Sequence, residues 1–328
     1  MSDIIAARSG TSSVRTLIGE AQSRIGDRVF YALCVLASVV ILATIAGILF
    51  QLVSSSQLSI AKFGFGFLTG STWDPVMEEY GARPFIYGTV VSSLMGLALA
   101  LPLSIGIAVF LVEVAGLNVR TIASFLVETL AAIPSVVYGV WGVFVMVPFI
   151  QEKVGMPLAE KFGESIPLFA GPAVGPSLLS AAVILAIMII PIITSITRDV
   201  MLAIPMSQRE AAFALGSTKW EAIKIVIANA RWGILGGIIL GLGRALGETM
   251  AVTLVIGNSP YINSSILQPS YTMASVIANE FTEATSDMYL SALIEVGLVL
   301  LITTFVVNML ARFLVWSVTR RSIAGGRQ

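Results

Sequence analysis

Two residues of opposite charge lie four positions apart in the segment GLGRALGETMAV at residues 241–252. They are Arg244 and Glu248, and their neighbours are mostly apolar residues and glycine. Residues i and i+4 of a helix are neighbours on its surface, so the two side chains can reach one another if the segment is helical. Inside a membrane each charge would cost about 2.5–3.5 kcal/mol, so each needs a partner or water. The segment therefore predicts a charged site or a structural ion pair.

The helix face that carries this pair also carries a row of glycines. With an advance of about 100° per residue, the pair shares a face with four of them: Gly233, Gly237, Gly241 and Gly247. Glycines spaced four apart favour close approach of two helices. Bulky residues such as Leu242 and Leu246 fall on the opposite flank, which we expect to face lipid. The pair should then point into a protein interior, where it either lines a passage or fixes helix packing.

Composition decides which solvent surrounds this helix. The chain has 328 residues, of which 56% are hydrophobic and 12% charged, whereas about a quarter of the residues in soluble domains are charged. A polytopic membrane protein is therefore expected. Histidine is absent and Cys34 is the only cysteine, so no disulfide framework and no metal site are predicted. The net charge of zero and the lack of a P-loop motif indicate no nucleic-acid partner and no nucleotide site.

Six apolar stretches are long enough to cross a bilayer, which requires roughly 20 residues each. They predict an all-α protein with six transmembrane helices, at about 29–53, 86–111, 121–149, 178–197, 232–257 and 291–317. Prolines interrupt three of the spans, and simple packing kinks or hinges are both open interpretations. These prolines are Pro102, Pro134 and Pro191.

The distribution of basic residues gives the orientation. Most lysines and arginines lie before the first span, in the 112–120 and 198–231 loops and at the C-terminus. The opposite side has only four of them: Lys62, Arg83, Lys153 and Lys161. By the positive-inside rule both termini are cytoplasmic. The expected organisation is a cytoplasmic segment at 1–28, a six-span domain at 29–317 and a cytoplasmic tail at 318–328.

The long cytoplasmic loop at about 204–226 contains two helix-start signals. Ser207 followed by Glu210 is one capping box, and Thr218 followed by Glu221 is another. Gly216 lies between them, where a left-handed residue can end a helix. We expect a short helix, a glycine break and a second helix that continues into span five. The small-residue surface of the first helix could enter a groove on another protein or lie on lipid.

Glu210-Ala211-Ala212, with Gly216 four residues later, resembles the coupling loop of ABC-importer permease subunits. Other segments are similar to permease subunits of phosphate importers in that family, and the resemblance extends over roughly residues 60–317. These segments are FIYGTVVSSL at 85–94, AAIPSVVYGVWG at 131–142, MIIPIITSITRD at 188–199, GLGRALGETMAV at 241–252 and ANEFTEA at 278–284.

The loop departs from the family pattern in its second half. Nine residues after the glycine the family continues with isoleucine, any residue, leucine and proline, whereas this chain reads Val226, Ile227, Ala228 and Asn229. The missing proline affects the expected geometry after the coupling helix but not the presence of that helix.

The resemblance implies a type I ABC-importer permease fold and a non-catalytic subunit that imports inorganic phosphate. It implies a second, similar permease, a cytoplasmic ATPase dimer that binds ATP and Mg, and a phosphate-binding protein outside a bacterial cytoplasmic membrane. This chain is expected to bind no cofactor itself. Arg244 and Glu248 would line the translocation path. Contact with the ATPase would involve Ser207, Arg209, Glu210, Ala211, Ala212 and Gly216.

Two other functions remain open at this point. An ABC permease could carry another oxyanion, such as sulfate, molybdate or a phosphonate. A secondary transporter without an ATPase would show two related halves, and no convincing internal repeat is visible. A membrane-embedded enzyme has little support, because no nucleophile–base pair or metal cluster is evident.

Overall fold

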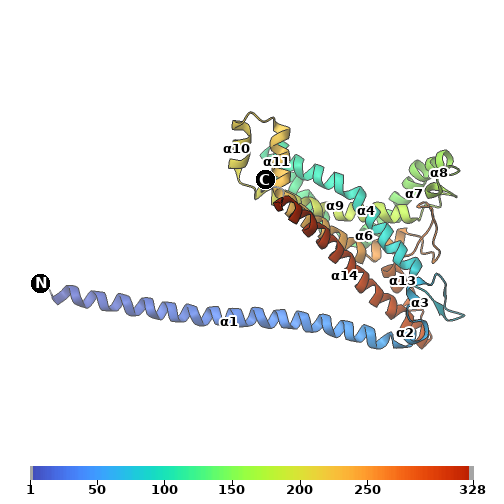
Figure 1. The fold of residues 1–328 in the computed structure, drawn as a ribbon, viewed down its shortest axis with the longest axis horizontal. Coiled ribbons are helices and arrows are strands. Elements are labelled where there is room, and N and C mark those ends of the chain that lie inside the picture. Colours follow the sequence, from blue (N-terminus) through green and yellow to red (C-terminus); the bar gives the residue numbers. More distant parts are fainter. Residues whose placement is uncertain (1–2, 325–328) are drawn as a thin grey trace. The chain divides into compact units, whose positions relative to one another are not determined.

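A computed structural model describes the backbone of residues 3–324 and the side chains of residues 26–313. It divides into two compact units, residues 1–54 and residues 55–328. The first unit is helix α1 (Asp3–Ser55), shown in Figure 1. Along its apolar half, large side chains such as Phe30, Leu42 and Phe50 are exposed, which suits a helix that lipid or another protein surrounds.

Six helices in the described residues are long and apolar enough to cross a membrane. They cover Gly26–Ser55, Arg83–Val114, Ser135–Phe162, Leu178–Leu202, Lys219–Gly247 and Asp287–Phe313. The predicted all-α, six-span fold class is therefore confirmed, although spans three and five differ in detail from the prediction.

The second unit is almost entirely helical. It contains α2 (Gln57–Phe63), α3 (Gly66–Thr69), β1 (Trp73–Asp74), β2 (Glu79–Tyr80), α4 (Arg83–Val109), η1 (Phe110–Val114), α5 (Leu117–Ala131), α6 (Ser135–Trp141), η2 (Gly142–Met146), α7 (Val147–Ile150), η3 (Gln151–Gly155), α8 (Met156–Phe162), η4 (Pro167–Phe169), α9 (Leu178–Leu202), α10 (Met206–Ala214), α11 (Lys219–Gly247), α12 (Met250–Val255), α13 (Met273–Glu280) and α14 (Asp287–Ala324).

Helix α9 is the centre of the packing, and α4 crosses it closely. A Cβ placed on Gly96 of α4 would lie 2.9 Å from the Cβ of Leu185, so glycine permits this approach. Two hydroxyl hydrogen bonds join the helices further along: Ser104 donates to the Ile190 carbonyl at 3.4 Å, and Thr194 donates to the Ser104 carbonyl at 3.3 Å. Both Pro102 and Pro191 lie inside helices that continue past them, so these prolines do not break their spans.

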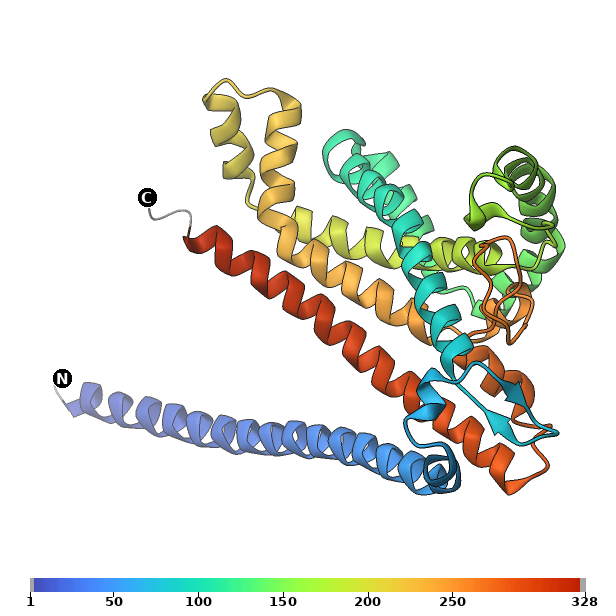
Figure 2. The ribbon, with the colours of Figure 1, turned by 45° about the vertical axis from the view of Figure 1, so that its right-hand side comes forward.

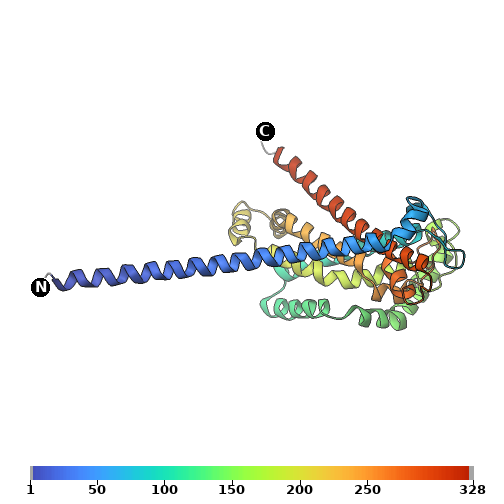
Figure 3. The ribbon, with the colours of Figure 1, turned by 90° about the horizontal axis from the view of Figure 1, so that it is seen from below.

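The third apolar stretch is two helices instead of one. α5 ends at Ala131, and a new helical run begins at Ser135 after Pro134, whose φ of −57° and ψ of 137° are not helical. The run continues through short π-helical turns to Phe162. Figure 3 shows the break as an unwound link between two helical pieces. The predicted continuous span at 121–149 is thus wrong at this link, because proline cannot continue the preceding helix.

The two ends of the second unit differ in character. The hairpin of α10 and α11 and the last turns of α14 lie at one end (Figures 1 and 2). At the other end, the antiparallel pair of β1 and β2 lies near α3 and α13, with Trp73 opposite Tyr80. An aromatic cluster fills that end, in which Tyr80 stacks on Tyr289 at 5.6 Å between ring centroids.

Candidate functional site

The break in span three leaves a backbone carbonyl without a helical partner, and a tyrosine satisfies it. The hydroxyl of Tyr138 donates to the carbonyl oxygen of Leu130 at 2.9 Å, across the link. Tyr138 is 9% exposed and belongs to the main hydrophobic core. A backbone carbonyl that loses its helical partner is stabilised by another donor, so Tyr138 stabilises the broken conformation.

Span five breaks as well, at the acidic residue of the predicted pair. α11 ends at Gly247, and Glu248 has an extended backbone with φ −70° and ψ 126°. The carboxylate Oε1 of Glu248 then accepts the backbone N–H of Ala251 at 3.3 Å, within the first turn of α12. A carboxylate at this position stabilises the N-terminal end of a helix.

The expected ion pair between Arg244 and Glu248 is therefore absent from the described residues. The i, i+4 spacing brings two side chains together only if the helix continues, and here it ends between them. Arg244 is exposed in the isolated chain and Glu248 is partly buried. The expectation of one continuous helix at 232–257 is wrong for the same reason.

The helices that follow the two breaks pack directly on each other. A Cβ placed on Gly139 of α6 would lie 2.7 Å from a methyl of Leu254 and 3.0 Å from the Cα of Ala251. Glycine at this position therefore permits close contact with α12. Arg244 lies in the last turn of α11, directly before the second break. The structure thus brings two broken spans and one guanidinium into the same part of the molecule.

The glycine row of α11 faces α9. A side chain on Gly233 would overlap the methyl groups of Val200, and a Cβ on Gly241 would lie 2.9 Å from Ile193. Gly237 lies between them, where a Cβ would be 3.0 Å from Ile196. Gly247 has nothing near its Cβ position. The first three glycines thus lie in a helix–helix contact, and Gly247 does not.

The assignment of the bulky flank of α11 to lipid is wrong. Leu242 and Leu246 are only 5% and 2% exposed and belong to the main core. α11 packs against both α9 and α4. Protein therefore covers the leucine flank of this helix as well as its glycine face. Leu240, on the other side of the helix, is exposed instead.

The cytoplasmic hairpin has the predicted order of helix, glycine and helix. Gly216 has φ +80°, and the N–H groups of Gly216 and Ser217 donate to Phe213 and Ala212, which is the Schellman pattern of a helix end. Thr218 and Glu221 form the expected capping box. The predicted box at Ser207 is absent, because α10 begins at Met206 after Pro205 and Ser207 lies inside the first turn.

Arg209 is not on the outer surface of this hairpin. It is 9% exposed and pairs with Glu113, at 2.8 Å from Nη2 to Oε1. Its guanidinium also donates to the carbonyls of Ile204 and Met201, at 3.0 Å and 3.2 Å. Arg209 therefore joins the hairpin to the end of span two and is not available to a partner protein. Sequence reasoning missed Glu113, because no local pattern indicates a partner so distant in the chain.

The remaining surface of the hairpin is exposed and partly apolar. Glu210 and Ala211 are exposed, whereas Ala212 is buried. Phe213 and Leu215 are 51% and 88% exposed. The hairpin thus presents a free apolar surface next to Glu210, the kind of surface that protein interfaces use.

Asn229 occupies the position where the family pattern has proline. Its amide donates to the Gln208 side chain at 2.7 Å, between α11 and α10. Without proline, α11 continues unbroken through this position. The hydrogen bond therefore joins α10 to a part of α11 that is not kinked.

The aromatic end of the unit is closed around a single carboxylate. Glu280 Oε2 accepts Trp73 Nε1–H at 2.8 Å and the Tyr289 hydroxyl at 2.7 Å. Burial, followed by the nearby charge of Glu78, raises the pKa of Tyr80 to about 12. Burial also raises the pKa of Tyr271. These groups hold the hairpin of β1 and β2 on α13 and α14.

Comparison with known proteins agrees with this geometry. The family described as "Binding-protein-dependent transport system inner membrane component" matches residues 100–321. The "Phosphate transport system permease protein PstC" of Mesorhizobium japonicum is 45% identical, over 90% of this chain and 92% of its own length. The protein of that name from Pasteurella multocida is 46% identical, over 84% and 88%. The "Probable phosphate transport system permease protein PstC" of Methanocaldococcus jannaschii is 36% identical, over 77% and 82%. The chain therefore belongs to the binding-protein-dependent transport system inner membrane components and, within them, to the PstC permeases.

Proposed function

We propose that this chain is a membrane-spanning subunit of an ATP-driven importer of inorganic phosphate. Its relatives carry the name of phosphate transport permeases. The observation that supports the proposal most is the meeting of two broken spans beside Arg244, which pairs with no carboxylate in the described residues. In transporters, broken transmembrane helices contribute to substrate sites, and a free guanidinium matches the oxygens of phosphate.

Arg244 and Glu248 have different roles in this proposal. Arg244 attracts the anion into the path. Glu248 accepts a hydrogen bond at the start of α12, so it helps to maintain the break, and it forms no ion pair with Arg244 in the described residues. If the path changes conformation, Glu248 can leave α12 and compete with the anion for Arg244, which would release the substrate.

The path would be completed by a PstA-like second permease. A PstB-like ATPase dimer, which holds ATP and Mg, would bind the hairpin through Glu210, Ala211, Phe213 and Leu215. The pair of Arg209 and Glu113 would then transmit motion of the hairpin to span two, because it is the buried link between them. The chain itself would need no cofactor and catalyse no reaction.

A PstS-like phosphate-binding protein would dock at the end that carries β1 and β2. Both termini would be cytoplasmic, with residues 1–28 and 318–328 outside the bilayer of a bacterial inner membrane. Lipid is then the other partner of the apolar surface, and no nucleic acid is involved. The charge asymmetry of the loops supports this orientation.

Co-purification and transport test the proposal together. The chain should be isolated from membranes with a second permease and an ATPase, and loaded binding protein should stimulate ATP hydrolysis by the complex. Phosphate uptake by Arg244→Gln should fall by about tenfold or more, the size expected for losing hydrogen bonds to a charged ligand. Arg231→Gln is the matched control, because Arg231 stacks on Trp232 and lies outside the path.

Uptake by Arg244→Gln close to that of the control, at equal expression, would rule out the role of Arg244. Inhibition of uptake by sulfate, molybdate or a phosphonate at the concentrations at which phosphate itself saturates would favour another oxyanion as the substrate. Uptake without any ATPase subunit would favour a secondary transporter.

A further inference from the structure

A groove of about 1140 Å³ separates α11 from α14, and apart from Arg244 its polar residues are not part of the site described above. Most of its wall is apolar. The side chains that can bind a ligand there are Arg244, Thr304, Asn308 and Arg312. None of the residues that line it is acidic, so the groove has uncompensated positive charge.

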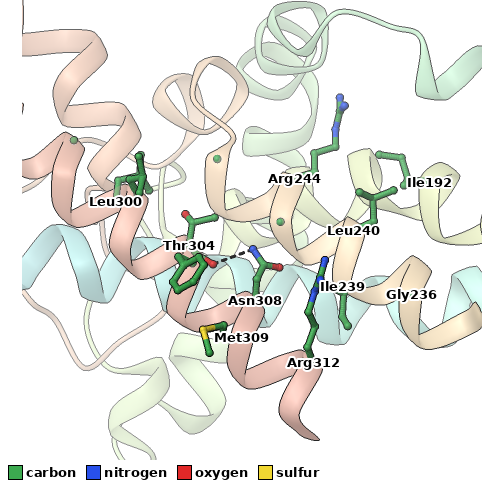
Figure 4. A pocket seen from close by; sticks show the side chains of 15 residues that line it. Ile192, Gly236, Ile239, Leu240, Arg244, Leu300, Thr304, Asn308, Met309 and Arg312 are labelled. Atoms are coloured by element: carbon green, nitrogen blue, oxygen red, sulfur yellow. Dashed lines mark hydrogen bonds between the residues drawn. The ribbon is translucent and has the colours of Figure 1, made fainter. Parts of the chain in front are cut away.

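Arg312 and Asn308 lie four residues apart on α14 and therefore on the same face of that helix. Figure 4 shows both side chains reaching toward α11, with the Arg312 guanidinium beside Ile239, whereas Arg244 extends away from them. The Asn308 amide donates to the Thr304 carbonyl at 2.9 Å. This leaves its second N–H and its oxygen for another partner.

Glycines of α11 provide the space in front of these two side chains. A Cβ on Gly243 would lie 3.8 Å from both polar atoms of the Asn308 amide, and Gly236 has nothing within 4 Å of its Cβ position. Arg312 forms no ion pair with any described residue. The groove therefore contains a guanidinium and an amide without a matching protein group opposite them.

The physics of such a groove favours an anion. Apolar walls strengthen the field of an uncompensated charge. Arg312 is exposed in the isolated chain, so an anion that enters the groove can reach it. A guanidinium and an amide together offer several parallel donors, which suit the oxygens of a phosphate group better than a single carboxylate. Simple extension of Arg312 toward the membrane surface would explain its charge but not the open amide beside it.

We propose that Arg312 and Asn308 form an inner binding site for a phosphate group, on the hairpin side of Arg244. Ile239 precedes Arg244 by five residues, so the new site would be about 7–8 Å further along the helix axis. The phosphate group could belong to the transported anion, as the second stop of the path, or to the headgroup of an anionic lipid. The first source rests on the proposed function, and the second does not.

Reconstitution distinguishes the sources. The complete importer is placed in vesicles of phosphatidylcholine alone or of phosphatidylcholine with phosphatidylglycerol. Wild type is compared with Arg312→Gln, Arg312→Lys, Asn308→Leu and the control Arg231→Gln. Phosphate uptake gives the turnover and the KM for loaded binding protein. Mass spectrometry counts the phosphatidylglycerol molecules that the purified complex retains.

If the transported anion binds here, turnover of Arg312→Gln should fall about tenfold in both vesicle types. Its KM for binding protein should not change, because that protein docks at the other end. If a lipid headgroup binds, the loss should occur only with phosphatidylglycerol, and fewer of these lipids should be retained. Arg312→Lys should be intermediate, and Asn308→Leu should show the same pattern at smaller size.

Turnover and lipid retention of Arg312→Gln equal to those of Arg231→Gln would overturn the site. Full activity of both single variants, Asn308→Leu and Arg312→Lys, would also refute the site. That result is expected if Arg312 only extends toward the membrane surface. If Arg312→Gln does not assemble with its partner subunits, Asn308→Leu decides instead. A wild-type complex that imports no phosphate would refute the proposed function. The site would then still be tested by comparing how much phosphatidylglycerol wild type and Arg312→Gln retain.

Discussion

Helix α11 has two faces that contain glycine for opposite purposes. On the closed face, Gly233, Gly237 and Gly241 lie so near to α9 that side chains there would meet Val200, Ile196 and Ile193. On the open face, Gly236 and Gly247 have nothing near their Cβ positions, and both line the groove toward α14. The closed face packs against α9, and the open face leaves space beside Arg244. Glycine content alone therefore does not reveal which face is used for packing.

Three arginines show the same contrast. Arg209 is buried and has a carboxylate and two carbonyls as partners, so its binding capacity is used within the chain. Arg244 and Arg312 have no carboxylate partner in the described residues. A guanidinium that the fold satisfies supports the structure, whereas one that it leaves unsatisfied is a candidate for an external ligand.

The largest effect should follow removal of the satisfied arginine. Arg209→Ala leaves Glu113, whose side chain is 12% exposed, as a largely buried and unpaired charge, which costs up to about 3–5 kcal/mol. The thermal unfolding midpoint of the purified complex should fall, or the complex should not assemble. In the double variant Arg209→Met with Glu113→Leu, most of this stability should return, because neither charge is then left alone.

Arg244→Met is the matched comparison, with a change expected within about 0.5 kcal/mol. Equal destabilisation by Arg209→Ala and Arg244→Met would refute the distinction between the two arginines.

The glycine contrast predicts the next largest effect. Gly233→Ala should destabilise the protein by about 1–3 kcal/mol, since the new methyl overlaps a stiff β-branched residue, Val200. Gly236→Ala should be neutral or stabilise by up to about 1 kcal/mol, because alanine favours helix and the space is empty. Thermal unfolding of the two variants measures the difference directly.

Combining Gly233→Ala with Val200→Ala should recover much of the loss, since the smaller residue removes the overlap. If Gly233→Ala is as stable as Gly236→Ala, the closed contact between α11 and α9 is not as tight as described.

The features predicted from sequence are those that a local rule determines. Apolar stretches about 20 residues long predicted the number of spans, although the third span covers Ser135–Phe162 and the fifth ends at Gly247. Gly216 was predicted as a helix end because glycine adopts positive φ without strain, and Thr218 because its partner Glu221 is three residues away. Such features need no knowledge of the rest of the fold.

The features that were missed depend on tertiary context. No proline marks the break at Glu248, so the sequence read as one helix. Ser207 matched a capping pattern, but the N-cap of α10 is Pro205, two residues earlier. Glu113 and Arg312 could not be recognised, since their significance comes from α10 and α11, which are far away in the chain.

The smallest expected effect concerns the aromatic cluster beside β1 and β2, where one buried hydroxyl has no hydrogen-bond partner. Tyr289 donates to Glu280, whereas the buried Tyr80 hydroxyl has no partner. Tyr289→Phe should cost about 1 kcal/mol, and Tyr80→Phe should be neutral or slightly stabilising.

The pKa of Tyr80 is raised to about 12, so at pH below 10 the hydroxyl is neutral in both the folded and the unfolded chain. Between pH 10 and 12 the unfolded chain releases this proton and the folded chain retains it, so wild-type stability should decrease as pH rises. Denaturation of Tyr80→Phe over the same range should decline less steeply than that of wild type, and parallel declines would show that the Tyr80 hydroxyl is not buried in the closed cluster.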